Sequence, residues 1–472
     1  MTDATGPPSA ASGPVEPQRL LLVLPSTAEF DSRTYRIASA ARARGHHVTV
    51  LARWKPGLPE REVDPGGYEI IRVRADPGEA LPGRAFVRRI FRRVRRQRSS
   101  AGALAAPTAD VHAQGDAGGP GDARQPGVDA SIGVASRSLP RRLASRVVRR
   151  WSILLTVRSH ARHAREAAPP ADVIHAMAYM GIPVGHAIAD GESPRPTVVY
   201  DARDIYMDAG NLAATRGLVR AAIARAERRW ARRADRVITV NQPYADVMAK
   251  RFKVPTPLVV MNCSYRYEPA DPRERRFHDR LGLAQSCRVV LYQGGFSPGR
   301  GIEELFDAIT LIDDAVLVLM GYGYEEAAYR ERAASPELRG HVHLLPAVRP
   351  IELLDWVAGA DVVAMPIQPT TLNHRLTTPN KLFEAMAAGV PVVASDLPGM
   401  APIVRETRCG LVVDPTDAAA IAAACRAILD APPEEAAAWR RRALAAAHET
   451  YNWETQADRL FAEYSRLTGR RW

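Results

Sequence analysis

Short apolar runs alternate with amphipathic stretches along most of the chain, a pattern typical of parallel β-sheets covered by helices. The first unit comprises an apolar run at Arg19–Pro25, a helical stretch at Ser32–Arg44 and a second apolar run at His47–Ala52. This β-α-β start indicates a doubly wound sheet. A long helix is predicted at Leu212–Arg233. Further strands are predicted at Tyr68–Val73, Asp172–His175, Thr197–Tyr200, Arg236–Val240 and Leu258–Met261.

A second series of the same kind begins at Arg288–Gln293. Its predicted strands are Val316–Met320, Val362–Met365, Val392–Ala394 and Gly410–Val413, and its predicted helices cover Ile351–Ala358, Ala418–Leu429 and Glu434–Leu467. The fold class is therefore α/β, with two doubly wound Rossmann-like domains facing a central cleft. We expect a disordered tail at residues 1–17, a first domain at 18–265 and a second at 266–450.

One predicted helix carries candidate chemistry. Thr378 is a suitable N-cap, Pro379 suits the first helical position, and Gly389 suits the left-handed position that follows a helix end. The apolar positions Leu382, Phe383, Met386 and Ala387 lie on one face.

Three polar residues of this helix, Asn380, Lys381 and Glu384, fall off the apolar face. A helix start with a lysine is a natural anion site, and a carboxylate one turn later can accept ribose hydroxyls. The alternative is an ordinary crossover helix with solvated polar residues.

The net charge of +12 on 472 residues is concentrated in one segment. Residues 84–165 contain 18 arginines and four aspartates, a charge of +14, whereas the other 46 basic and 48 acidic residues sum to −2. Amphipathic basic helices are predicted at 84–98 and 139–165, separated by a low-complexity, disordered linker at 99–137. Contact with an anionic membrane surface is one interpretation. The other is that both helices pack on their own domain. Nucleic acid is not expected, because no recognition motif accompanies the arginines.

The cysteines and the N-terminus indicate the compartment. Cys263, Cys287, Cys409 and Cys425 are scattered without a CxxC pair or a His/Cys cluster, so neither a disulfide framework nor a zinc site is expected. The first residues lack the pattern of a signal peptide, and no apolar run approaches a membrane span. We expect a cytoplasmic protein that can lie on the inner face of the plasma membrane.

The chain resembles the retaining nucleotide-sugar glycosyltransferases of the GT-B fold, in the family called glycosyl transferases group 1. The second domain carries the specific stretches LYQGGFSPGRGIEELFDAI (291–309), MGYG (320–323), GADVVAMP (359–366), TPNKLFEAMAAGVPVVASDLPG (378–399) and CGLVVDP (409–415). The closing stretch YNWETQADRLFAEY (451–464) is also typical of the group. The N-terminal match is looser and comprises RARGHHVTVLA (42–52), ADVIHA (171–176), VVYDARDIY (198–206) and ADRVITVN (234–241). The resemblance implies that a terminal helix at 451–472 returns to the first domain.

The resemblance also assigns roles to individual residues. Gly294, Gly295 and Gly321 are expected to approach the donor diphosphate, together with the helix start at Thr378, Pro379 and Asn380. Arg300 and Lys381 would neutralise the departing diphosphate without a metal, and Glu384 would bind the ribose. The donor would be a UDP- or GDP-sugar, used as a substrate, and no cofactor is expected.

Three positions depart from the family pattern. Gly295 stands where many members carry an arginine, Leu376 replaces a glutamate that faces the donor sugar, and Arg203 replaces a histidine. Donor recognition would then differ, with Asn373, His374 or Arg375 as candidates. The histidine's role near the sugar would pass to Arg203, to Asp204 or to neither.

The predicted activity is sugar transfer with retention to a saccharide or lipid-linked acceptor, in envelope polysaccharide or glycolipid synthesis. The alternatives are a non-catalytic sugar-nucleotide-binding subunit and a GT-B-type nucleotide-sugar epimerase.

Overall fold

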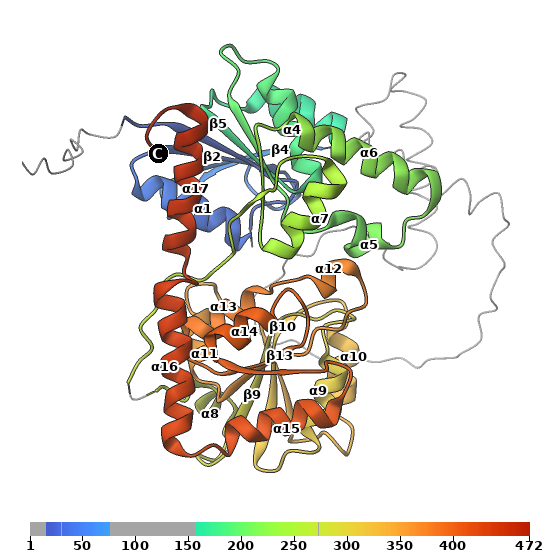
Figure 1. Cartoon of the computed structure of the whole chain (residues 1–472), viewed down its shortest axis with the longest axis vertical. Coiled ribbons are helices and arrows are strands. Elements are labelled where there is room, and N and C mark those ends of the chain that lie inside the picture. The colour runs from blue at the N-terminus through green and yellow to red at the C-terminus, as the bar shows by residue number, and fades with distance from the viewer. Residues whose placement is uncertain (1–15, 30, 76–155, 272) are drawn as a thin grey trace, which may run out of the picture.

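Two α/β domains lie one above the other in the computed structural model, which describes residues 16–29, 31–75, 156–271 and 273–472 (Figure 1). The predicted tail, the basic helix at 84–98, the linker at 99–137 and most of the basic stretch at 139–165 lie outside these residues. Of that stretch, residues 156–165 are helical, in a helix that continues to residue 167.

The first domain is built on an eight-stranded sheet with the order β3-β4-β2-β1-β5-β6-β7-β8. Every pairing is parallel except that of β3, a short edge strand that the hydrophobic pattern did not predict. The strands are β1 (Arg19–Val23), β2 (His47–Arg53), β3 (Arg61–Val63), β4 (Glu69–Val73), β5 (Val173–Met177), β6 (Thr197–Asp201), β7 (Arg236–Thr239) and β8 (Leu258–Val259). The helices are α1 (Ser32–Ala43), α4 (Ala178–Ala189), α5 (Gly210–Ala213), α6 (Gly217–Arg233) and α7 (Gln242–Phe252), with a 3₁₀ turn, η1, at Tyr206–Asp208.

The second domain has a six-stranded parallel sheet with the order β11-β10-β9-β12-β13-β14. Its strands are β9 (Arg288–Gly295), β10 (Ala315–Tyr322), β11 (Val342–Pro346), β12 (Val362–Met365), β13 (Val392–Ser395) and β14 (Gly410–Val413). Its helices are α8 (Arg276–Leu281), α9 (Ile302–Ile309), α10 (Glu326–Ala333), α11 (Leu353–Ala358), α12 (Leu372–Arg375), α13 (Asn380–Ala387), α14 (Ala401–Thr407), α15 (Ala418–Leu429) and α16 (Pro433–Glu449).

Both sheets bury their two faces, as parallel sheets require. Successive residues of a strand point to opposite faces, so Leu20 and Leu22 enter one core cluster of the first domain, and Leu21 and Val23 enter the other. The predicted fold of two doubly wound domains is confirmed.

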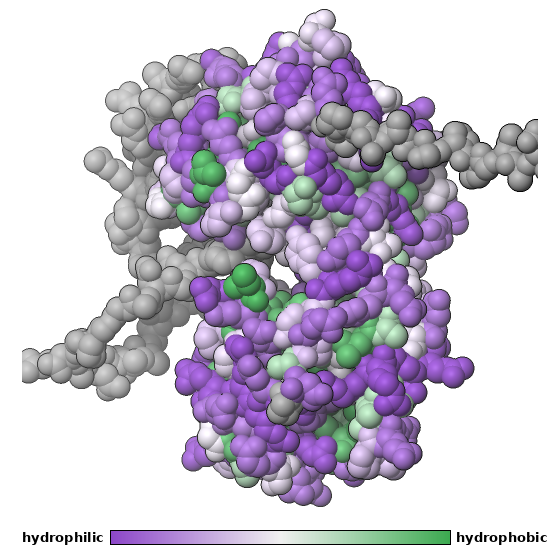
Figure 2. Space-filling view, turned by 90° about the vertical axis from the view of Figure 1, so that its left-hand side faces the viewer, coloured by the Kyte–Doolittle hydropathy of each residue, from purple (hydrophilic) through white to green (hydrophobic). Residues whose placement is uncertain are grey.

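The last helix, α17 (Trp453–Thr468), leaves the second domain and packs on the first (Figure 1). Trp453, Phe461 and Tyr464 are buried in the same core cluster as β1 and α1. The predicted return of the C-terminal helix is therefore confirmed. The face of the molecule that carries α16 and α17 is mostly hydrophilic and is indented between the two domains (Figure 2).

Two long predicted helices are broken in the structure. The stretch 212–233 is interrupted because Arg216 is extended and Gly217 has a φ of 62°, which separates α5 from α6. The stretch 434–467 is interrupted at Asn452, whose side chain accepts a hydrogen bond from the Thr455 N–H (2.8 Å) and donates one to the Ala447 carbonyl (3.0 Å). Asn452 is thus the N-cap of α17, and its side chain also binds a backbone carbonyl at the end of α16.

Candidate functional site

The carboxyl ends of β9 and β10 form a tight glycine corner. Gly294 pairs with Gly321 across the two strands, and a side chain at Gly321 would place its Cβ 1.9 Å from the Gly294 carbonyl oxygen. Gly294 itself has a φ of 124°, a conformation that side chains other than glycine rarely adopt. The structure therefore brings Gly294 and Gly321 together, with Gly321 buried and Gly294 half-buried, and no side chain of either residue stands between this backbone and Lys381.

Gly295 follows directly and faces open space, because a Cβ there would meet nothing within 4 Å. A side chain could therefore begin at this position, where many family members carry an arginine, but this chain places no charge there.

Helix α13 begins close to this corner. Its N-terminal cap differs from the predicted one. Pro379 is the N-cap and Asn380 the first helical residue, and no side chain caps the helix. Thr378 is not the cap because its hydroxyl donates to the Gly399 carbonyl and accepts from the Asn241 amide (3.0 Å). The predicted C-terminal residue Gly389 is correct, with a φ of 66°.

Lys381 occupies the space between α13 and the glycine corner. Its Nζ lies 3.4 Å from the centroid of the Tyr292 ring, yet it has no hydrogen-bond partner and the residue is only 8% exposed. Burial, reinforced by the neighbouring Arg300, lowers the pKa of this ammonium group well below its usual value. A buried cation without an anion is costly, so this position favours a negatively charged ligand.

Glu384, one turn further along α13, is also buried. Its Oε2 lies 3.5 Å from the Gln293 amide nitrogen at the end of β9. Burial raises the pKa of the Glu384 carboxyl, although Arg36 and Lys381 oppose the shift. The alternative of an ordinary crossover helix with solvated polar residues therefore does not fit Lys381 and Glu384, because both are buried.

The covering residues of the first domain were not found from sequence. Arg36 donates to the side chain of Asn262 (2.8 Å), and Asn262 donates to the Asn380 side chain at the start of α13 (3.0 Å). Asn262 directly follows the predicted strand Leu258–Met261. Its place at a strand end is the one signal in the sequence that could have indicated it.

Arg300 precedes Gly301, the N-terminal cap of α9, and is half-buried. Its Nε lies 3.4 Å from the Ser297 hydroxyl, and its charge contributes to the lowered pKa of Lys381. Arg300 therefore lies close enough to Lys381 to act on its charge, and a joint role of the two residues at a diphosphate stays a prediction.

Arg203 belongs to a different environment. It lies in the first domain after β6, where its Nη1 donates to both carboxylate oxygens of Asp31 at 2.8 and 2.7 Å. Burial alone would raise the pKa of Asp31, but Arg203 and the Thr34 backbone N–H outweigh it and hold that pKa low. A direct role for Arg203 at the donor sugar stays a prediction.

The stretch that departs from the family pattern joins the two domains. Leu372 and Leu376 pack against the core of the first domain. Asn373 accepts from the Ile205 N–H (2.8 Å) and donates to Asp204 (3.0 Å), while Tyr244 donates to its carbonyl (2.9 Å). Leu376 is therefore a domain contact, and Asn373 is occupied by the same contact.

The other two candidates for donor recognition lie apart from this contact. His374 lies 2.8 Å from the Thr370 hydroxyl, and Arg375 is exposed. Among the described residues no group of three or more His, Cys, Asp or Glu side chains is arranged to hold a metal ion. Metal independence stays a prediction.

The fold and these motifs agree with comparisons to known proteins. Residues 287–431 match the family described as glycosyl transferases group 1, and residues 99–264 match glycosyltransferase family 4. Among solved structures, sucrose-phosphate synthase from Thermosynechococcus elongatus superimposes with a TM-score of 0.65 at 19% identity, covering 96% of this chain and 99% of that one. The architecture is thus that of the GT-B glycosyltransferases.

Two curated relatives are similar in sequence. D-inositol 3-phosphate glycosyltransferase of Streptomyces scabiei is 28% identical over 303 residues, which are 60% of each chain. GDP-mannose-dependent alpha-(1-6)-phosphatidylinositol monomannoside mannosyltransferase of Mycolicibacterium smegmatis is 31% identical over 211 residues, 44% of this chain and 54% of that protein. The matches thus span 60% or less of these relatives. The second domain thus matches the group 1 glycosyltransferase family, and the whole chain has the GT-B fold.

Proposed function

We propose that this chain transfers a sugar from a nucleotide-diphosphate donor to an acceptor hydroxyl. The observation that carries the proposal is the buried, unpartnered ammonium group of Lys381 beside the Gly294 corner and the uncapped start of α13. Backbone N–H groups at a helix start and a lysine together suit a diphosphate. Glu384 is one turn further along, where a carboxylate can accept the ribose hydroxyls.

The chemistry follows from where charge develops. The bond between the anomeric carbon and the diphosphate oxygen breaks, and its electron pair stays on the diphosphate. Lys381 and Arg300 stabilise that charge, and preorganised cations of this kind are worth more in a water-poor site. The acceptor oxygen forms the new bond on the same face, and its proton passes to the departing phosphate oxygen. The product then retains the anomeric configuration, and no protein nucleophile or metal is needed.

The donor and acceptor are inferred from chemistry and from the relatives. The relatives' printed names contain inositol 3-phosphate, phosphatidylinositol and GDP-mannose. We take the donor to be a UDP- or GDP-sugar and the acceptor a polyol phosphate or lipid-linked hydroxyl, in envelope polysaccharide or glycolipid synthesis.

Proton NMR of the reaction with UDP- and GDP-sugars, a polyol phosphate acceptor and EDTA tests this proposal. A new glycoside with the donor's anomeric configuration supports it, and an inverted product contradicts the same-face route. Donor binding without turnover would instead favour a non-catalytic subunit, which the burial of Leu376 in the domain contact also suits. An epimerised nucleotide sugar formed without acceptor would identify an epimerase.

The cellular place is part of the same proposal. None of the helices in the described residues combines the length and apolarity needed to cross a bilayer. We infer a cytoplasmic enzyme that binds the inner face of the plasma membrane through residues 84–98 and 139–165. Co-sedimentation with phosphatidylglycerol vesicles should decrease on deletion of residues 84–165, and equal binding would contradict the inference.

A further inference from the structure

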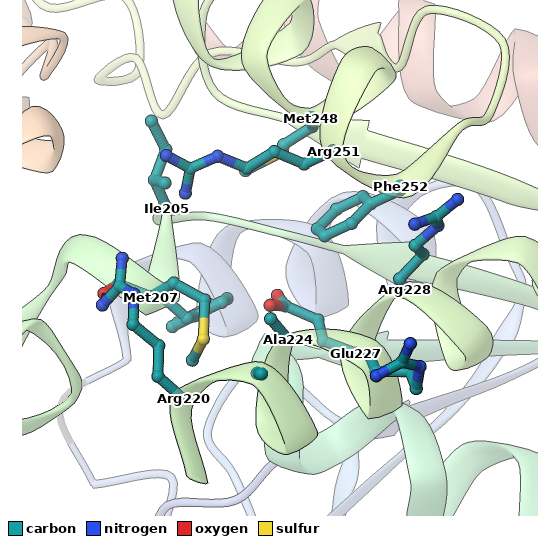
Figure 3. A pocket seen from close by; sticks show the side chains of 12 residues that line it. Ile205, Met207, Arg220, Ala224, Glu227, Arg228, Met248, Arg251 and Phe252 are labelled. Atoms are coloured by element: carbon teal, nitrogen blue, oxygen red, sulfur yellow. Dashed lines mark hydrogen bonds between the residues drawn. The ribbon is translucent and has the colours of Figure 1, made fainter. Parts of the chain in front are cut away.

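A separate cavity of about 400 Å³ lies in the first domain between η1, α6 and α7 (Figure 3). Its lining contains none of the donor-site residues. The segment from β6 through η1 separates the cavity from the contact between the domains. Asp204 accepts a hydrogen bond from Asn373 of the second domain, whereas Ile205 and Met207 line the cavity. Any ligand here would occupy a site distinct from the cleft between the domains.

The interior of the cavity is largely apolar. Met207, Met248 and Phe252 are buried and line it, together with Ala224 of α6. Thioether and phenyl groups adapt well to an unbranched alkyl chain. The interior therefore offers an apolar surface for a chain of a few carbons.

Four arginines line the same cavity, and they divide into two pairs. Arg220 and Arg251 bind the two carboxylate oxygens of Asp208 at 2.9 and 2.6 Å. Arg225 and Arg228, on α6, form no ion pair with any residue in the described part of the chain. This second pair is available to an anion.

The carboxylate of Glu227 does not cancel that charge. It points into the cavity between Met207 and Phe252 and accepts a hydrogen bond from the Tyr200 hydroxyl at 2.9 Å (Figure 3). Burial raises its pKa to about 7, although the Tyr200 hydrogen bond and Arg251 oppose the shift. The lining therefore stays positively charged at neutral pH.

We propose that this cavity binds a phosphate-bearing amphiphile, with its phosphate at Arg225 and Arg228 and its alkyl chain on Met207, Met248 and Phe252. The ligand class is a phosphate ester with an apolar chain, whether embedded in a bilayer or dissolved as a monomer. The site requires no glycosyl transfer and stands independently of the proposed activity.

Calorimetric titration of the full chain with monomeric dihexanoyl phosphatidylglycerol tests the site. Replacing Arg225→Ala should weaken binding about fivefold, and the double variant with Arg228→Ala roughly thirtyfold, the factors expected for arginines beside anionic lipid. Arg229→Ala and Arg232→Ala, which change the same helix outside the cavity, are the matched controls and should leave binding unchanged. Equal weakening by the controls would overturn the proposal.

A second variant tests the apolar part. Ala224→Trp fills the cavity without changing charge and should abolish binding of the monomer, while circular dichroism confirms that the variant is folded. Inorganic phosphate should not replace the amphiphile. If phosphate alone binds as tightly, or if Ala224→Trp binds normally, the cavity is not the site.

Vesicles of phosphatidylcholine with and without phosphatidylglycerol distinguish the source of the amphiphile. Vesicle binding that falls with Arg225→Ala identifies a bilayer lipid, and binding of monomers alone identifies a soluble amphiphile.

Discussion

Lys381 is the residue on which the proposed donor site depends, and its buried position is unfavourable for the protein without a ligand. Its ammonium group is buried over the Tyr292 ring with no hydrogen-bond acceptor. Such a group stabilises a bound anion at the expense of the stability of the empty protein. The position of Lys381 therefore leads to one prediction about stability and one about ligand binding.

Lys381→Met should increase the free energy of unfolding at neutral pH, because it removes a buried ammonium group that has no hydrogen-bond partner. Because burial lowers the pKa of Lys381, the unfolded chain binds more protons than the folded one between the folded pKa and the usual value. Stability of the unsubstituted protein should therefore rise with pH across that window, and the variant should lack this rise. Urea unfolding at several pH values measures both. Lys250→Met, at an exposed position, is the control, and a destabilised Lys381→Met would contradict the account.

Binding of UDP or GDP should take up a proton. A bound diphosphate should raise the pKa of Lys381 from its lowered value. The affinity for the nucleotide should therefore fall as the pH rises above the pKa that Lys381 has in the protein without ligand. The charged groups that act on Lys381 are Arg300, which favours the neutral lysine, and Glu384, which favours the charged one. Calorimetry in buffers of different ionisation enthalpy detects the proton. A Lys381→Arg variant should bind with little pH dependence, and proton release by the unsubstituted protein would be the opposite result.

The helix pattern singled out Lys381 and Glu384, because they lie near a helix start, and the family resemblance added Gly294 and Gly321. The pattern could not show that Arg36 of the other domain acts on Glu384, or that Asn262 binds Asn380 at the start of α13. Contacts between residues more than a hundred positions apart leave no local signal.

At the scale of elements, the short helix α12 and the residues after it hold the two domains together. Asn373 bonds both the Ile205 N–H and the Asp204 carboxylate. Asn373→Ala would leave the Ile205 N–H unpaired at a buried position and should cost about 1–3 kcal/mol. Small-angle scattering should show a larger radius of gyration, since the domains separate more readily. The exposed neighbour variant Arg375→Ala should leave scattering unchanged, and an unchanged Asn373→Ala would show that other contacts determine the domain arrangement.

Helix α17 is the second connection. Trp453 is 1% exposed, and its indole N–H donates to the Arg36 carbonyl at 3.1 Å. Trp453→Ala should lower the free energy of unfolding by about 3–5 kcal/mol, because it leaves a large cavity in the first domain's core. Denaturant unfolding followed by circular dichroism measures the loss. Glu449→Ala, at an exposed site on α16, is the control, and a loss no larger than the control's would show that α17 is only loosely attached.

The elements themselves were mostly predictable, because strands buried on both faces appear as continuous apolar runs. Helix ends were less predictable. Thr378 has the right chemistry for a cap, but the Gly399 carbonyl and Asn241 bind its hydroxyl instead. The break before Gly217 depends on backbone conformation, which the amphipathic pattern of 212–233 does not encode.

At the scale of the whole molecule, the proposed donor site includes residues of both domains. The second domain supplies the glycine corner, Lys381, Arg300 and Glu384, and the first supplies Arg36 and Asn262 as the cover. Leu376 and Asn373 contact the first domain, and this contact holds Arg36 and Asn262 near the start of α13. A ligand at Glu384 therefore meets groups from both domains.

The most direct measurement is a parallel calorimetric titration of UDP and GDP into the unsubstituted protein, Lys381→Met and Lys250→Met. One of the two nucleotides should bind the unsubstituted protein and the Lys250→Met control equally. Lys381→Met should bind it at least about tenfold more weakly, as expected for loss of a hydrogen bond to a charged group. Equal affinity for all three proteins, or no binding of either nucleotide, would contradict the assignment of this site to a nucleotide-diphosphate donor.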